Sequence, residues 1–488
     1  MHRSTSSWIF GAFLPVVAVA VAAAFAAPPS PMIRSSAAGG DADDAPFASS
    51  LLPLLAASIE SHNRPQHHHH RKQRGRMIIA EAIARPAAAV FLGASSRAAA
   101  GRAAASVAGR PPAPSIDPSE EAGGVAVAVG SSVLRLPSGA RVRLFYPAGR
   151  RNSTTTTSSS SSFAPYCTDG RRTSDGMASI VGLHRLGLSF LLGHLAGASS
   201  GCVEDAAPAA MMMIGHDRIR LPSSGEEEVE EEAPPLLPLL VYSHGMRGNM
   251  DAASHFFRAV ASRGAIVAAL EHTDGTASHA VLADGSERMF DEHRMTGRQQ
   301  LVRRASELLE AAKHLPDEIR RMHHGVAIVG HVMLGGHGLG AASAIMAANG
   351  ASSSVDPSES YVRGVVLHDP TLGMGYGILP PNGSRCRVPA VTYVSDGYRR
   401  SDVRYGDVTL HARGSRHWNF LDAPLWVPRW AAGPLSRVVP SAASASYAIE
   451  LHDRLADSAM AFLESADPTC KGVVVTSEGG LLDVVHRG

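Results

Sequence analysis

The chain has 488 residues, a formal net charge of +1 at pH 7 and an isoelectric point near 7.9. This balance excludes a strongly basic protein that binds nucleic acid through its net charge, so we expect no nucleic-acid partner. Glycine (47 residues) and proline (31 residues) are abundant, which favours many loops and low-complexity segments.

Residues 1–27 are predicted to be a targeting segment. Arg3 precedes an uncharged apolar run from Trp8 to Ala27, and Ala24-Phe25-Ala26 fits a signal-peptide cleavage site. The run is also about long enough to cross a bilayer, so the segment is either a cleaved signal peptide or a membrane anchor. Both alternatives predict the secretory pathway and an extracellular or membrane-anchored protein.

The rest of the chain divides by composition. Residues 28–122 are rich in Ala, Ser, Pro and Arg without sustained periodicity, which predicts a low-complexity and largely disordered region. We expect a folded domain over 123–470, with polar insertions near 151–162 and 223–233 and a tail over 471–488. The cysteines, which allow either two disulfides or a reduced set and contain no C-x-x-C pair typical of zinc sites, are Cys167, Cys202, Cys386 and Cys470.

Within 123–470 short apolar runs alternate with helical patterns. The residues from Val125 to Tyr146 predict two strands around a turn. Residues 178–195 are apolar at helical spacing, which predicts either a core helix or a helix that covers an active site. Further strands are expected at 236–242, 265–270, 331–334, 362–367 and 388–394, and further helices at 252–263, 299–314 and 446–465. This alternation predicts an α/β fold with a mostly parallel, doubly wound sheet and crossover helices.

The stretch from Gly335 to Ser343, GGHGLGAAS, follows a predicted strand and opens a predicted helix. This is the setting of the nucleophile elbow G-x-S-x-G of α/β-hydrolases, yet Gly338 stands at the position of the serine. His337 is then an elbow spacer that points into the structure. Ser343 is a poor substitute nucleophile, because it lies inside the following helix.

Asp369 and His417 complete the chain order nucleophile, acid, histidine that is typical of this fold. His417 would act as general base, and Asp369 would fix its tautomer and stabilise its charged form. The backbone N–H groups of Leu339 and Met246 would form the oxyanion hole. Such a mechanism needs neither a metal nor another cofactor.

A second interpretation of the same glycines is a dinucleotide-binding turn. Gly336-x-Gly338-x-x-Ala341 also matches G-x-G-x-x-G/A, and Asp369 would then bind a ribose. The acidic residue comes later than the usual spacing of about 20 residues, and this interpretation leaves His417 without a role. It is the remote alternative.

The chain resembles the plasma-type platelet-activating factor acetylhydrolases over most of 123–470. The segments that carry the resemblance are VGSSVLRLPSGARVRLFYPA (129–148), PLLVYSHGM (238–246), AIVAALEHTDGTAS (265–278), GGHGLGA (335–341), VVLHD (365–369) and GSRHWNF (414–420). The resemblance implies an α/β-hydrolase that removes short sn-2 acyl groups from phospholipids without a metal. It also implies that Asp369 and His417 are triad residues, and that Met246 and Leu339 are oxyanion-hole residues.

At Gly338 the sequence departs from this family, because no Oγ is present to form an acyl-enzyme. His417 then has only water to activate, so whether this copy is an enzyme stays open: it is either weakly active or inactive. The alternative is a secreted or membrane-anchored lipid-binding pseudoenzyme, with a phospholipid as substrate or ligand. Trp418, Trp426 and Trp430 either contribute to peripheral contact with a lipid surface or pack in the ordinary way.

Overall fold

The computed structural model describes residues 128–148, 163–180, 183, 189–206, 208, 236–323, 328–351, 361–371, 386–397, 406–427, 444–464 and 480–487. The predicted targeting segment, the low-complexity region, both polar insertions, Cys470 and Trp430 lie outside these residues. No helix among the described residues has the length and apolar character needed to cross a membrane.

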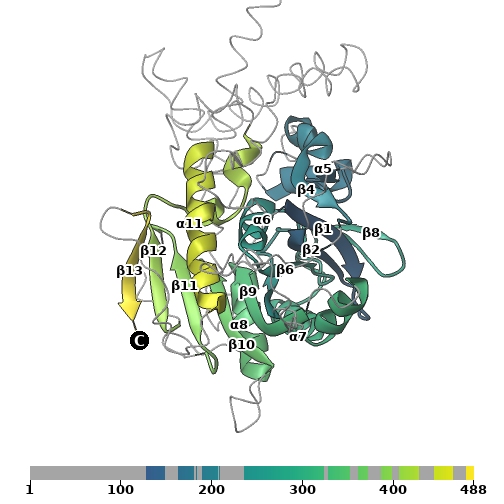
Figure 1. Ribbon diagram of the computed structural model, residues 1–488. Helices are drawn as coiled ribbons and strands as arrows, with labels where there is room; N and C mark the ends of the chain where they lie inside the picture. The colour runs from purple at the N-terminus through teal and green to yellow at the C-terminus, as the bar shows by residue number, and fades with distance from the viewer. Residues whose placement is uncertain are drawn as a thin grey trace, which may run out of the picture.

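Strands and helices alternate along the chain (Figure 1). The strands are β1 (Ala128–Arg135), β2 (Arg141–Ala148), β3 (Phe163–Pro165), β4 (Ser199–Glu204), β5 (Leu236–Ser243), β6 (Ile266–Glu271), β7 (His279–Val281), β8 (Glu287–Met289), β9 (Ile328–His337), β10 (Val362–His368), β11 (Ala390–Val394), β12 (Val408–Ala412) and β13 (Leu482–Arg487). The helices are α5 (Arg171–Ile180), α6 (Ser254–Ser262), α7 (Gly297–Met322), α8 (Leu339–Ala351) and α11 (Ala445–Glu464), with 3-10 turns η2 (Ser189–Gly197), η5 (His417–Phe420) and η6 (Ala423–Trp426).

One large sheet organises the described residues, in the order β13-β12-β11-β10-β9-β5-β6-β2-β1-β4-β3. From β12 to β6 every neighbouring pair of strands is parallel. Antiparallel pairing is found toward the two edges, where β2 pairs with β6 and β13 with β12. The predicted α/β fold with a mostly parallel sheet is therefore confirmed.

The core lies on both faces of this sheet, because side chains along a strand point alternately to opposite sides. In β5, Leu239 and Val241 pack on the side of α7 and α8, whereas Leu240 and Tyr242 pack on the side of α6 and α11. All four side chains are at most 1% exposed. A strand covered on both faces needs apolar residues at successive positions, which explains the unbroken run LLVY.

Two elements differ from the sequence-based expectation. Residues 482–487, assigned above to a tail, form β13 and pair with β12, so they belong to the sheet. Helix α7 continues through Pro316 to Met322 instead of ending near His314. Proline removes one backbone hydrogen bond, but the buried Leu315 and Ile319 hold the following turns against the core.

The predicted core helix over 178–195 is divided between two elements. Helix α5 ends at Ile180, and the 3-10 turn η2 begins at Ser189. Apolar spacing correctly placed Leu192 and Leu195 in the core, where both are at most 5% exposed. It did not reveal that the backbone there follows the tighter 3-10 geometry, in which the hydrogen bonds join residues three apart.

Candidate active site

The glycine-rich stretch forms a sharp turn between β9 and α8. Strand β9 ends at His337, Gly338 has φ +58°, and α8 starts at Leu339. This left-handed backbone conformation costs an L-residue with a Cβ roughly 1–2 kcal/mol and costs glycine almost nothing. The Gly338 N–H donates to the His368 carbonyl at 3.0 Å, which fixes the turn beside the end of β10.

The flanking glycine Gly340 is required for close packing. A Cβ at Gly340 would lie 2.0 Å from the carbonyl oxygen of Ser243, at the end of β5. Any side chain at this position would therefore push the start of α8 away from β5. The register of β5 and β9 pairs Ser243 with Gly336, so the SHGM turn and the elbow leave the sheet side by side.

Asp369 and His417 are brought together although they are far apart in the sequence. The Nδ1 atom of His417 lies 2.8 Å from Oδ2 of Asp369. Asp369 is fully buried and also accepts hydrogen bonds from the backbone N–H and the hydroxyl of Ser395, at 2.9 and 3.0 Å. The His417 side chain keeps 18% of its surface exposed, so a buried carboxylate orients an imidazole that solvent can reach.

His417 faces the position that a serine side chain would occupy. A Cβ built on Gly338 would lie 3.3 Å from Nε2 of His417 and 3.4 Å from Oγ1 of Thr371. Thr371 lies just after the acid and donates its backbone N–H to the Gly338 carbonyl at 3.1 Å. The sequence interpretation did not identify Thr371 or Ser395, because neither belongs to the motif and only the sheet order places them here.

Two buried histidines hold the 3-10 turn η5 that carries His417. The His337 Nε2 atom lies 3.0 Å from the carbonyl oxygen of His417, and the His452 Nε2 atom lies 2.9 Å from that of Asn419. Burial lowers the pKa of His452 to about 4 and that of His337 well below its usual value, so both rings are neutral and can donate one N–H. His337 is thus more than an elbow spacer, since it contacts the base turn directly.

The two expected oxyanion-hole residues lie on neighbouring elements. Leu339 is the first residue of α8, where backbone N–H groups lack partners within the helix and favour negative charge. Met246 lies in the turn after β5. This turn packs on the elbow, since a Cβ at Gly245 would lie 2.8 Å from Nδ1 of His337.

Below that turn, the pattern of hydrogen bonds from Ser243 through His272 to Glu307 resembles a Ser–His–acid triad. Ser243 Oγ is 2.7 Å from His272 Nε2, and His272 Nδ1 is 2.7 Å from Glu307 Oε2. Ser243 and His272 are fully buried, so no substrate can reach this serine. Arg304 donates to the carbonyl of the next residue, His244, at 2.5 Å. Together these hydrogen bonds hold the first two residues of the SHGM turn in place.

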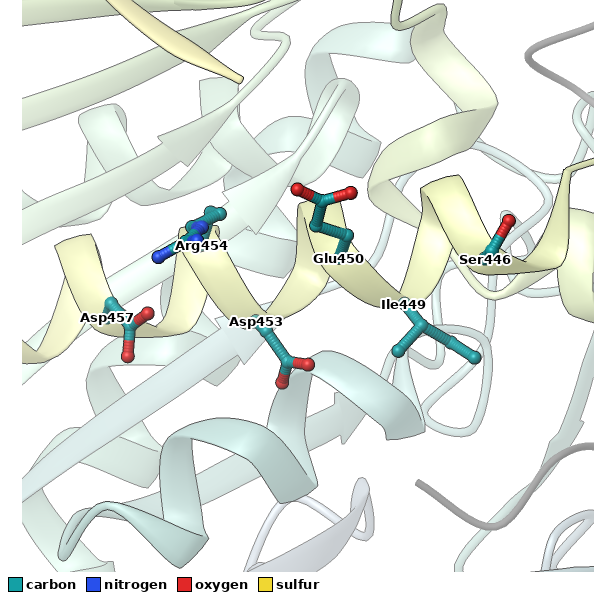
Figure 2. Close-up of a pocket in the computed structure, with 6 residues that line it drawn as sticks. All are labelled: Ser446, Ile449, Glu450, Asp453, Arg454 and Asp457. Atoms are coloured by element: carbon teal, nitrogen blue, oxygen red, sulfur yellow. The ribbon is translucent and has the colours of Figure 1, made fainter. Parts of the chain in front are cut away.

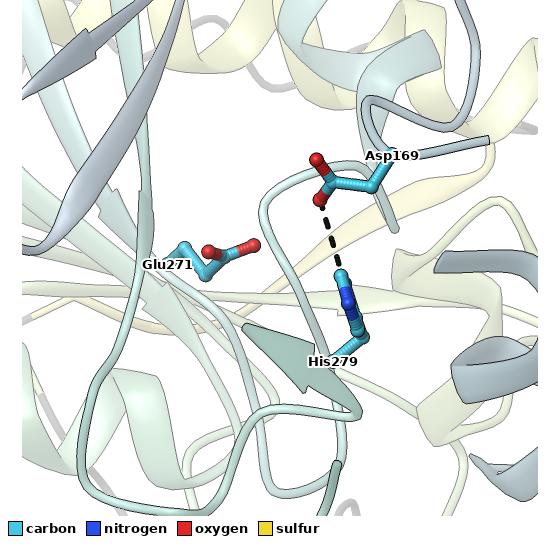
Figure 3. Close-up of side chains that lie close together, drawn as sticks. All are labelled: Asp169, Glu271 and His279. Carbon is cyan, nitrogen blue, oxygen red and sulfur yellow. Dashed lines mark ion pairs between the residues drawn. The ribbon is translucent and has the colours of Figure 1, made fainter. Parts of the chain in front are cut away.

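Among the residues that the structure describes, one group of side chains has the composition of a metal site. Asp169, Glu271 and His279 lie close together (Figure 3), with His279 Nδ1 3.4 Å from Asp169 Oδ2. The Arg141 guanidinium donates to both carboxylates, at 2.8 Å to Glu271 and 2.9 Å to Asp169. A guanidinium already occupies the space between the two carboxylates and hydrogen-bonds to both, so these residues fit an ion-pair network better than a cation site.

A shallow hollow lies along α11 (Figure 2) and is lined by Ser446, Ile449, Glu450, Asp453, Arg454 and Asp457. Arg263 pairs with Asp457 at 2.7 Å and with Asp453 at 3.7 Å. The buried His452 belongs to the opposite side of the same helix, where it contacts η5. The hollow is therefore separate from the elbow.

Three other expectations are settled by burial and bonding. Asp369 is enclosed by His417 and Ser395 and cannot hydrogen-bond a ribose, so the dinucleotide interpretation is wrong. Trp426 is 1% exposed and donates to Tyr166 at 2.7 Å, so it packs in the core and faces no lipid. The three described cysteines, Cys167, Cys202 and Cys386, are free thiols, which excludes the two-disulfide alternative.

A central parallel sheet, a strand–turn–helix elbow and an acid–base pair at the ends of later strands define an α/β-hydrolase. Within this class, the model of the family "Platelet-activating factor acetylhydrolase, isoform II" matches residues 209–318. This match bears out the resemblance noted in the sequence over the part of the chain that it covers.

The other comparisons add little to this assignment. A ferulic acid esterase from Streptomyces cinnamoneus has a similar structure at 18% sequence identity, with a TM-score of 0.47, over 75% of this chain and 98% of the esterase. No curated protein matches the chain.

Proposed function

We propose that the chain is a phospholipid acetylhydrolase-like protein in which Gly338, in place of the nucleophilic serine, prevents formation of an acyl-serine intermediate. The observation that carries the proposal is the Asp369–His417 pair, at 2.8 Å, directed at a glycine in the position of the nucleophile. In this proposal His417 is the general base, Asp369 orients it, and the N–H groups of Leu339 and Met246 bind the oxyanion. The substrate class, short sn-2 acyl esters of phospholipids, rests on the family relationship.

The test compares the unmodified protein with Gly338→Ser and Gly338→Ala. Removing the serine of a comparable hydrolase costs about 10⁶ in kcat, with roughly 10³–10⁴ over water surviving, so Gly338→Ser should raise ester hydrolysis by about 10³-fold or more. Gly338→Ala shares the Cβ without the hydroxyl and should gain nothing. Rates are measured with a 2-acetyl phospholipid and with p-nitrophenyl acetate.

A fluorophosphonate probe checks the same point without turnover. It should label Gly338→Ser, and adding His417→Ala should abolish that labelling because the base no longer activates the serine. A Gly338→Ser protein that folds but hydrolyses no ester would contradict the proposed substrate class.

The second candidate function is a lipid-binding pseudoenzyme, which Gly338 itself favours. Gly338 adopts its φ of +58° without the strain that a serine would carry, so the elbow can persist as a binding turn. This candidate predicts that the unmodified chain binds 2-acetyl phospholipid vesicles but neither hydrolyses the lipid nor reacts with fluorophosphonate. Labelling of the unmodified chain would exclude it.

The proposed location is the secretory pathway, with the protein extracellular or membrane-anchored and in peripheral contact with lipid. The support is the apolar run from Trp8 to Ala27 with Arg3 before it. Expression of the full chain with a C-terminal tag should place the protein in the medium or in the membrane fraction. Recovery only from the cytosol would contradict this location.

A further inference from the structure

The backbone around Met246, the proposed oxyanion donor after β5, is anchored at two points. Met246 is partly exposed, and none of the hydrogen bonds within the described part of the chain uses its N–H. Before it, the His244 carbonyl accepts a hydrogen bond from Arg304 at 2.5 Å. After it, the Arg247 N–H donates to the Thr276 carbonyl at 2.8 Å. The N–H of Met246 therefore lies between two held neighbours.

The side chain of Arg304 joins both anchors. Besides the His244 carbonyl, its guanidinium donates through Nε to the Thr276 hydroxyl at 3.0 Å and to Oδ2 of Asp274 at 2.9 Å. Asp274 accepts from both the N–H and the hydroxyl of Thr276, at 3.0 and 2.6 Å. Arg304, Asp274 and Thr276 are fully buried, so these charge-assisted hydrogen bonds are protected from water.

The backbone of Arg247 indicates that the turn is constrained. Its φ of +64° lies in the left-handed region, which is unfavourable for a residue with a Cβ. Such a conformation persists only where the surrounding structure fixes it. The Thr276 carbonyl supplies part of that constraint, and the Ser278 N–H, which donates to the Gly248 carbonyl at 2.8 Å, supplies another part. Without these anchors Arg247 can relax, and the turn that carries Met246 then changes direction.

We propose that Arg304 is a positioning residue, which acts with Asp274 and Thr276 to hold the Met246 N–H toward the oxyanion before a substrate binds. This inference rests on the proposed function and identifies the side chains on which its oxyanion hole depends. A donor that is already oriented needs no reorganisation as negative charge develops, so it stabilises the transition state more than the ground state. Disrupting the network should therefore lower kcat and leave KM nearly unchanged.

The first experiment measures p-nitrophenyl acetate hydrolysis in the Gly338→Ser background. Thr276→Val removes the hydroxyl that bonds to Arg304 and Asp274, and it should lower kcat about 10-fold with KM within about 3-fold. Thr276→Ser keeps the hydroxyl and should recover most of the rate. Equal kcat values for the two variants would overturn the inference.

The second experiment removes the ion pair itself in the same background. Arg304→Met/Asp274→Asn leaves no buried unpaired charge and should lower kcat by about 10²-fold, as the loss of an oxyanion donor does. Arg143→Met/Asp251→Asn is the matched control, because this buried pair bonds at 2.6 Å but contacts residues 165–168 instead of the SHGM turn. It should lower the melting temperature without changing kcat more than about 3-fold. A similar loss of kcat in both double variants would contradict a positioning role.

A trifluoromethyl ketone provides a readout that a general loss of stability does not move. It adds to the introduced serine of Gly338→Ser, and the resulting hemiketal oxygen carries the charge that the oxyanion hole binds. In Arg304→Met/Asp274→Asn the inhibition constant should rise by about the same factor as kcat falls. An unchanged inhibition constant would show that the network does not act through the oxyanion.

Amide hydrogen exchange tests the network in the unmodified chain, independently of turnover. Arg304→Met/Asp274→Asn should speed exchange of the Arg247 amide about 10-fold or more, because its acceptor is no longer anchored, and the Arg143/Asp251 control should not. If Gly338→Ser is active but neither this exchange nor kcat responds, the inference fails and the proposed function stands. If Gly338→Ser is inert while the exchange responds, the proposed function fails, and the catalytic role of the network fails with it.

Discussion

Gly338 has two effects at the scale of the residue, one on chemistry and one on backbone strain. It removes the hydroxyl, and it allows φ +58° without a Cβ. A serine there would have to fit a Cβ only 3.2 Å from Cε1 of His417, closer than ordinary van der Waals contact. Restoring the nucleophile therefore requires the imidazole to shift by a few tenths of an ångström.

We expect Gly338→Ala to lower the free energy of unfolding by about 1–2 kcal/mol, because alanine is strained in the left-handed region. Gly170→Ala is the matched control, since Gly170 has φ +55° and no heavy atom within 4 Å of a built Cβ. Urea unfolding of both variants separates backbone strain from crowding against His417. A smaller loss for Gly338→Ala than for Gly170→Ala would show that the elbow imposes no extra crowding.

At the scale of the element, η5 is the part on which the site depends. It is a short turn with no sheet partner, and side chains from β9 and α11 hold it by its carbonyl groups. Behind it, Nδ1 of His452 lies 3.7 Å from the buried Asp422. The position of His417 is therefore set by one residue of the elbow, His337, and by one remote from it, His452.

His452→Leu in the Gly338→Ser background should lower kcat about 10-fold with KM nearly unchanged, because the base turn loses its support while the acyl site is intact. His452→Gln keeps an N–H donor and should recover most of the rate. A purely structural role would lower the melting temperature of both variants alike and leave their kcat unchanged.

At the scale of the whole molecule, several histidines are buried in the neutral state. Burial lowers the pKa of His368 to about 3 and that of His452 to about 4, and it lowers those of His244, His255, His272 and His337 as well. The buried Asp422 is shifted the other way, because burial raises its pKa to about 7.

The sign of the pH dependence follows from these shifts. A histidine with a depressed folded-state pKa stabilises the fold above its unfolded value, about 6.5, and this stability is lost as the pH falls toward the folded-state pKa. Asp422 instead stabilises the fold below its unfolded pKa of about 4, and this contribution is lost as the pH rises through about 7. The histidines outnumber it, so the free energy of unfolding should fall between pH 7 and pH 5.

His368 provides the measurement. This histidine alone should lower the free energy of unfolding by about 2 kcal/mol at pH 5 relative to pH 7. Its Nδ1 contacts the Tyr242 hydroxyl at 2.8 Å, so the double variant His368→Phe/Tyr242→Phe removes the titrating group with its partner. Urea unfolding at both pH values should show a smaller pH-dependent loss in the double variant than in the unmodified chain. An unchanged loss would contradict the contribution assigned to His368.

The sequence by itself determined the α/β class, the main strands and helices, and the chain order of Gly338, Asp369 and His417. It could do so because apolar periodicity and glycine-rich turns are local signals. The same reasoning missed Thr371, Ser395 and the histidines that hold η5, and it left β13 in the tail.

Only the tertiary structure decided those positions, because they depend on which strands are neighbours. The order β9-β10-β11 places Thr371 and Ser395 beside the elbow, and α11 returns across the sheet to bring His452 under the base turn. Such contacts join residues far apart along the chain and leave no periodic trace in it. The glycine at 338 is visible in the sequence, but what surrounds the missing hydroxyl is a property of the fold.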